Sequence, residues 1–142
     1  MLAEIEAALT QHPAIAVQTC TRVQRTAAQL EYLGVAAKAQ LWRARHLLRA
    51  GDPASAQSAL HETLPLLNEV QLADTFVPEA WWIAYEIFDS AGDAVAAIRA
   101  LQRAVDWIEQ SALPHVPDEF KDSFLNRNPV SRAVLTTATR RA

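Results

Sequence analysis

The sequence predicts an all-α protein, and three observations support this fold class. Alanine occupies 28 of the 142 positions and glycine only three, which favours helix over strand. No stretch shows the alternation of Val, Ile and Thr with polar residues that marks a β-strand. An eleven-residue phrase at residues 50–60 returns 41 residues later, at residues 91–101, with six identical positions. A repeat of this period is typical of stacked helical hairpins.

About seven helices are expected along the chain. The first two are predicted over residues 2–11 and 14–33, because Pro13 disfavours helical geometry at the residue before it. Gly34 is expected to end the second helix in the left-handed conformation. The later helices are predicted over residues 36–50, over 53–72 with a bend at Pro65, over 78–91, and from Asp93 to about Gln110, followed by a capping segment.

The repeated phrase places a Gly-Asp pair between the two helices of each hairpin. Gly51 and Gly92 are expected to end one helix, and Asp52 and Asp93 to cap the next through their carboxylates. Small residues and one leucine then recur where the paired helices must approach closely. They are Ala56, Ala59 and Leu60 in the first copy, and Ala97, Ala100 and Leu101 in the second.

This pattern resembles the tetratricopeptide repeat, which alternates two antiparallel helices with small residues at their crossing. The second copy matches at Trp81, Tyr85, Phe88, Gly92, Ala97, Leu101 and Ala104, and the first at Ala44, Leu47, Gly51, Ala56 and Leu60. The first copy departs from the pattern at Gln40 and Arg43, and the period exceeds the usual length of about 34 residues. The resemblance implies a single domain with an αα-superhelix: N-terminal helices over 1–34, repeats over 36–72 and 78–110, and a cap over 114–142.

The tail carries a second resemblance. Residues 116–132 are similar to the C-terminal ending of large bacterial helical-repeat proteins, whose repeats follow an ATPase, a nucleotide-cyclase or a transcription-regulator module. This implies the C-terminal part of a cytoplasmic bacterial signalling or transcription regulator. A physical interpretation stands beside it, because a repeat stack needs a polar cover over its last apolar face. Phe120, Phe124 and Leu125 are expected on the buried side of that cover, and Asn128 is expected to cap a final helix that Pro129 opens.

Composition and motifs exclude several function classes. The formal charge of −3 lacks the basic excess of a nucleic-acid binder, and no apolar run reaches the roughly 20 residues of a membrane span. The single Cys20 is expected to be buried in a protein of the reducing cytoplasm. The histidines lie on separate elements, and no phosphate-binding loop or nucleophile motif is present. No metal, cofactor or enzymatic activity is therefore expected.

The tetratricopeptide resemblance also implies a groove for a partner, lined by the first helix of each repeat. The family's groove positions fall on Lys38, Leu41, Arg45, Leu48 and Arg49, and on Glu79, Trp82, Glu86 and Asp89. One hypothesis makes the three cations a grip for an acidic segment, with the tryptophan as its apolar floor. A second hypothesis pairs Arg45 with Glu86 and Arg49 with Asp89, because adjacent helices lie about 8–10 Å apart. In a third, the 14–33 helix covers part of this groove.

These observations predict a non-catalytic protein–protein interaction module. Its partner is expected to be a protein, a peptide or a second copy of the chain, and neither a nucleic acid nor a membrane. The alternative is a sensor domain that binds a small effector in the helical groove.

Overall fold

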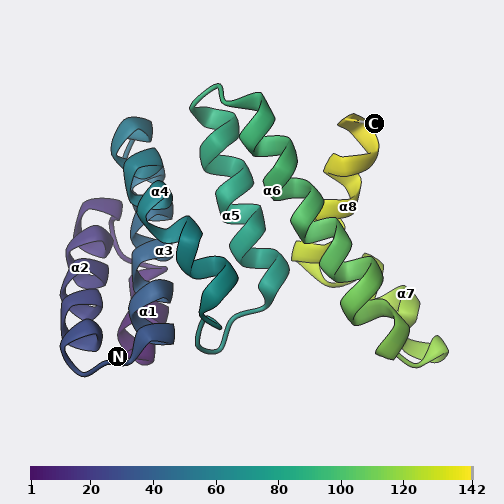
Figure 1. Cartoon of the computed structure of the whole chain (residues 1–142), viewed down its shortest axis with the longest axis horizontal. Coiled ribbons are helices and arrows are strands. Elements are labelled where there is room, and N and C mark those ends of the chain that lie inside the picture. Colours follow the sequence, from purple (N-terminus) through teal and green to yellow (C-terminus); the bar gives the residue numbers. More distant parts are fainter. Residues whose placement is uncertain (142) are drawn as a thin grey trace. The chain divides into compact units, whose positions relative to one another are not determined.

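The computed structural model describes residues 1–141, and that part of the chain folds into eight α-helices without a strand (Figure 1). The all-α prediction is confirmed. The chain divides into two compact units. The first is Met1–Thr75 with the short turn Ser90–Gly92, and the second is Phe76–Asp89 with the chain from Asp93 onward. The division after Thr75 falls in the connection expected between the two repeats.

The first unit holds four helices: α1 (Leu2–Ala8), α2 (Pro13–Gln29), α3 (Leu33–Arg49) and α4 (Pro53–Glu69). Helix α2 packs along α3, and α3 packs along α4. Helix α4 continues through Pro65 to its end. Alanine is the commonest buried residue of this unit, and larger residues such as Val23, Leu41 and Leu60 are buried with it. Small side chains on facing helices allow their backbones to approach closely, as the repeat pattern predicts.

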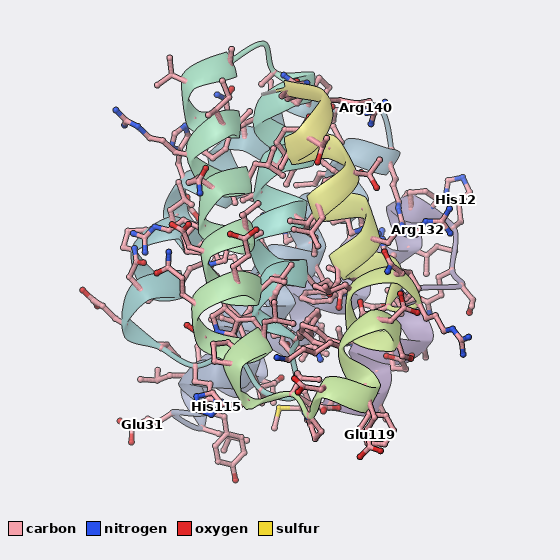
Figure 2. The ribbon with its side chains drawn as sticks, turned by 90° about the vertical axis from the view of Figure 1, so that its right-hand side faces the viewer. His12, Glu31, His115, Glu119, Arg132 and Arg140 are labelled. Carbon is pink, nitrogen blue, oxygen red and sulfur yellow. The ribbon has the colours of Figure 1, made fainter. Side chains whose placement is uncertain are left out.

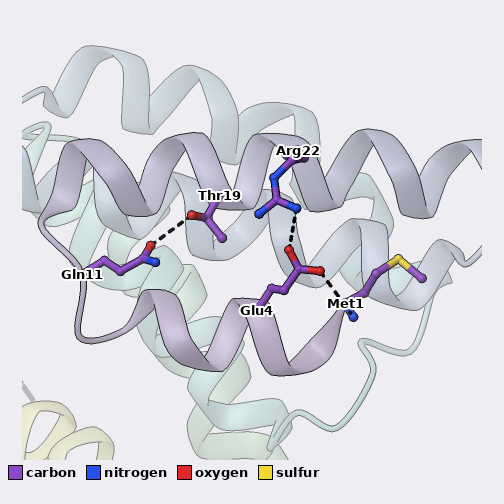
Figure 3. Close-up of polar contacts among 5 residues, drawn as sticks. All are labelled: Met1, Glu4, Gln11, Thr19 and Arg22. Atoms are coloured by element: carbon purple, nitrogen blue, oxygen red, sulfur yellow. Dashed lines mark hydrogen bonds and ion pairs between the residues drawn. The ribbon is translucent and has the colours of Figure 1, made fainter.

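Polar contacts attach the short helix α1 to α2 (Figure 3). Arg22 Nη1 lies 2.6 Å from Glu4 Oε2, and Glu4 Oε1 lies 3.8 Å from the amino group of Met1. The Thr19 hydroxyl donates to Gln11 Oε1 at 3.0 Å. Exposed pairs of this kind contribute only about 0–1 kcal/mol each. The burial of Ile5 and Ala8 therefore supplies most of the attachment of α1.

The turn between α2 and α3 corrects the predicted end of the second helix. Helix α2 ends four residues earlier than expected, and Glu31 (φ 61°) is the residue in the left-handed conformation. The backbone N–H of Tyr32 donates to the carbonyl of Ala27 at 2.8 Å, which closes the helix end. A glutamate in the sequence does not indicate a left-handed helix end, so this conformation was predicted at the nearby Gly34 instead.

Gly34 instead lies in the first turn of α3, where its role is to admit another stretch of backbone. A Cβ at this position would lie 2.6 Å from the carbonyl oxygen of Gln71. The backbone N–H of Ala73 donates to the carbonyl of Gly34 at 3.3 Å. The glycine is therefore required by a close approach between α3 and the segment that follows α4.

Glu31→Gly is expected to raise the free energy of unfolding by about 1 kcal/mol. A side chain in the left-handed region costs roughly 1–2 kcal/mol, and glycine returns part of this gain through the entropy of the unfolded chain. Urea denaturation of both proteins measures the difference. Gln18→Gly, at an exposed position inside α2, is the control and is expected to lose about 1 kcal/mol. A destabilised Glu31→Gly variant would show that the turn is not strained.

The two Gly-Asp turns have the predicted geometry. Gly51 and Gly92 adopt φ angles of 83° and 79°. The carboxylates of Asp52 and Asp93 each accept a hydrogen bond from the backbone N–H three residues later, both at 3.1 Å. The backbone N–H groups of the same two aspartates close the preceding helices at 3.0 Å. The repeated phrase thus builds the same helix–turn–helix junction twice.

Helix α3 buries a histidine. His46 is 1% exposed, and its Nε2 has no hydrogen-bond partner in the described chain. Burial, together with the smaller effect of the charges of Arg49 and Arg45, lowers the pKa of this imidazole from 6.5 to about 4. The folded protein therefore holds this side chain in its neutral form at neutral pH.

The buried His46 predicts a loss of stability in mild acid. Because its pKa is lower in the folded state, the unfolded chain takes up the proton first, and stability falls as pH decreases from about 6.5 to about 4. Between about pH 7.5 and pH 5 the loss from this group is expected to be about 2 kcal/mol. Urea denaturation across this range measures it. His46→Leu should remove this part of the pH dependence; an unchanged slope would contradict the assignment.

The second unit holds α5 (Val77–Ser90), α6 (Ala94–Asp106), α7 (Asp118–Asn126) and α8 (Pro129–Arg141). Helix α8 packs against α6 and α7. After α6 the chain winds through a π-helical turn, Trp107–Ala112, and a 3₁₀ turn, Leu113–His115. The guanidinium of Arg103 lies 5.2 Å from the centroid of the Trp81 ring, which joins α6 to α5.

The tail confirms one predicted cap and corrects one predicted core residue. Asn128 Oδ1 accepts hydrogen bonds from the first two free backbone N–H groups of α8, both at 3.0 Å, as expected. Phe124 is half-buried, with its ring 6.3 Å from that of Phe76, and the Phe76 ring lies 5.3 Å from that of Trp107. Phe120 is 57% exposed, so its predicted burial is wrong. It lies in the first turn of the short α7, one turn before the residue that reaches this aromatic cluster.

Candidate functional site

Two of the predicted groove residues are buried in the first unit. Lys38 is only 8% exposed, and its Nζ donates to the carbonyl oxygen of Asp74 at 2.9 Å. The same ammonium lies 5.2 Å from the centroid of the Trp42 ring. Leu41 is fully buried, and Trp42 is 4% exposed, so this tryptophan is a packing residue. Lys38 therefore ties the segment after α4 to α3.

The remaining predicted residues of the first unit lie at the end of α3. Arg45 and Leu48 are half-buried and Arg49 is exposed. Glu79 and Glu86, on α5 of the second unit, are half-buried. The proposed Arg45–Glu86 and Arg49–Asp89 pairs would join the two units, and both stay predictions.

Asp89 has a partner that the sequence analysis missed. Arg141 Nη2 donates to Asp89 Oδ1 at 2.8 Å, and its guanidinium lies 5.3 Å from the centroid of the Tyr85 ring. The Tyr85 ring lies 5.1 Å from the Trp82 ring, with a tilt of 30°. The end of α8 therefore lies over an aromatic pair of α5, and Tyr85 packs against Trp82 from one side.

Trp82 forms one wall of an open groove of about 660 Å³. The other walls come from the end of α7 and one face of α8. They are lined by Asn126, Arg127, Pro129, Arg132, Ala133, Thr136, Thr137 and Arg140. The spacing of the α8 residues, three or four apart, places them on one helical face. Figure 2 shows Arg132 near the beginning and Arg140 near the end of this helix.

The groove is positively charged. Arg127, Arg132 and Arg140 are exposed, and none of the three forms an ion pair within residues 1–141. Among residues 1–141, no carboxylate lines the groove. Three guanidinium groups and one half-buried indole therefore border the same hollow.

Comparison with known proteins adds no assignment. No family model, curated protein or solved structure matches the chain.

A signal for this groove is present in the sequence. Residues 126–141 contain four arginines and no acidic residue, whereas the whole chain carries a formal charge of −3. The net charge hides this local excess. Sequence reasoning did identify Trp82 as a possible floor, but it placed the cations on the 36–50 helix instead of the tail.

The chemistry offered elsewhere in the described chain is limited. Within residues 1–141 no three His, Cys, Asp or Glu side chains gather as metal ligands. None of the helices there has the length and apolar character that crossing a lipid bilayer demands. Cys20 is buried, and burial raises the pKa of its thiol to about 11, so it stays protonated and unreactive at neutral pH.

Proposed function

We propose that this chain is a non-catalytic protein-interaction module that binds a partner segment in the groove between Trp82 and α8. The observation that favours this proposal most directly is the series of contacts that packs against one side of the Trp82 indole. Asp89 holds Arg141, which covers Tyr85, which packs on Trp82. A tryptophan held in place and open on one side loses little entropy on binding, and Trp and Arg often carry most of an interface's affinity.

The repeat architecture supports the same proposal. The two matched Gly-Asp junctions agree with the resemblance to tetratricopeptide repeats, and helical repeats of that kind use extended surfaces for binding. With the resemblance of the tail, we place the module at the C-terminal end of a bacterial signalling or transcription regulator of the cytoplasm.

A small-ligand sensor is the second candidate, and the size of the groove is the observation that favours it. Its volume of about 660 Å³ lies within the range of about 300–1,000 Å³ that small-molecule sites occupy. Such sites are mostly apolar and bury their ligand, whereas this groove is open and rich in arginine. The geometry therefore favours a peptide segment over a small effector.

A random peptide library displayed on phage tests the proposal. Selected peptides should bind the intact protein and lose at least about tenfold in affinity for Trp82→Ala, because the indole is the expected anchor. Trp42→Phe, at a packing position of the first unit, is the matched control and should bind as the parent does. Thermal unfolding checks that both variants are folded. Peptides that ignore Trp82, together with a metabolite whose stabilising effect requires it, would support the sensor instead.

A further inference from the structure

We infer that the partner of this groove is an acidic segment of another protein, in which two or more carboxylates flank a large apolar side chain. This inference rests on the proposed function and names the chemistry of its partner. Three exposed arginines lie beside Trp82 in a groove that no carboxylate of residues 1–141 lines.

The first step is charge. Guanidinium groups bind carboxylates through two parallel hydrogen bonds. Within the described chain, no carboxylate pairs with Arg127, Arg132 or Arg140. Arg141 shows the contrast, because Asp89 already neutralises it. The cationic character of the groove is therefore available to a partner.

The second step is spacing. Arg132 and Arg140 are eight residues apart on α8, which corresponds to about 12 Å along the helix at 1.5 Å per residue. An extended peptide covers about 12 Å in three to four residues, at roughly 3.3 Å per residue. Two carboxylates separated by two or three residues can therefore engage both arginines at once.

The third step is the apolar contact between those charges. Trp82 lines the groove together with Ala133 and the pyrrolidine of Pro129. A Phe, Leu or Trp side chain placed between the two carboxylates can pack on this apolar strip. Burial of such a side chain removes apolar surface from water and so favours binding.

The surroundings of the groove favour a protein segment over a nucleic acid. A single strand makes phosphate contacts along a continuous basic track. Here α7 carries three exposed acidic residues just before Arg127, namely Asp118, which pairs with Lys121, and Glu119 and Asp122, and the whole chain is acidic. A phosphate backbone that leaves the groove along α7 meets these charges, whereas a peptide of a few residues stays within it.

The test uses the whole chain and fluorescence anisotropy. The probes are labelled peptides with Glu-Glu on either side of a central Phe, Leu or Trp, and matched peptides with Gln in place of Glu. At least one Glu peptide should bind at low salt, and its Gln counterpart should bind at least about tenfold more weakly. The double variant Arg132→Glu with Arg140→Glu should lose the Glu peptide and gain affinity for a Lys version. Arg25→Glu, an exposed arginine of α2, is the control and should change neither.

Each other outcome overturns the inference in a recognisable way. Equal binding of Glu and Gln peptides, with dependence on Trp82, would leave the groove a peptide site that does not recognise acid. Tighter binding of a single-stranded oligonucleotide that the double variant loses would make the partner a nucleic acid. Light scattering that shows a dimer abolished by the double variant, without peptide binding, would make it a second copy. No binding by the whole panel rejects the acidic segment.

Discussion

Leu60→Ala and Leu101→Ala are each expected to lower the free energy of unfolding by about 2–5 kcal/mol. The two leucines occupy the same position of the repeated phrase, and they are 0% and 4% exposed. Truncation removes buried apolar surface and leaves a cavity that the surrounding helices fill only in part. Urea denaturation followed by circular dichroism measures both losses. Because Leu60 lies in the first unit and Leu101 in the second, the pair also reports whether the two units unfold together.

Val95→Ala is the control for this pair. Val95 lies on α6 with Leu101 but is 62% exposed, so its truncation should change stability by less than about 0.5 kcal/mol. Near-equal losses for Leu60→Ala and Leu101→Ala would support an equivalent role of the two positions. If Leu101→Ala lowers the free energy of unfolding no more than Val95→Ala does, the two leucines of the repeated phrase do not have equivalent packing roles.

The features predicted well are those that depend on neighbours in the sequence. A Gly-Asp pair ends one helix and caps the next through residues within five positions, so Gly51 and Gly92 were assigned correctly. The cap at Asn128 is equally local. The alanine and leucine positions of the phrase were predicted to be buried, because residues that recur after 41 positions lie on the same face of the corresponding helix in both copies.

Several features that sequence reasoning missed depend on contacts with distant parts of the chain. Lys38 was expected to line an open groove. Instead, its ammonium donates a hydrogen bond to the carbonyl of Asp74, which lies 36 residues later in the sequence and belongs to the same first unit. The pair that Arg141 forms with Asp89, 52 residues away, was not anticipated, because only Arg49 was considered as a partner of Asp89. A repeat pattern shows which residues share a helical face, but it does not show which loop or tail covers that face. The cations beside Trp82 were missed for the same reason.

Gly34→Val is expected to lower the free energy of unfolding by about 2–3 kcal/mol. Helix propensity alone predicts the opposite, because glycine is a poorer helix residue than valine by a few tenths of a kcal/mol. The close approach of the Gln71 carbonyl to Gly34 makes the net effect on stability unfavourable. Any Cβ at this position meets the Gln71 carbonyl oxygen at 2.6 Å, and the obstructing atom is backbone, which cannot rotate away as a flexible side chain can.

Hydrogen exchange separates this steric cost from a general loss of stability. The Ala73 amide donates to the Gly34 carbonyl, so Gly34→Val should speed its exchange by more than the global destabilisation explains. Gly51→Ala is the matched control. It has open space around a Cβ but a φ of 83°, so it should lose about 1–2 kcal/mol and leave the relative protection of Ala73 unchanged. A Gly34→Val variant as stable as the parent would mean that the segment after α4 does not press on α3, and the attachment through Lys38 would then rest on its single hydrogen bond to Asp74.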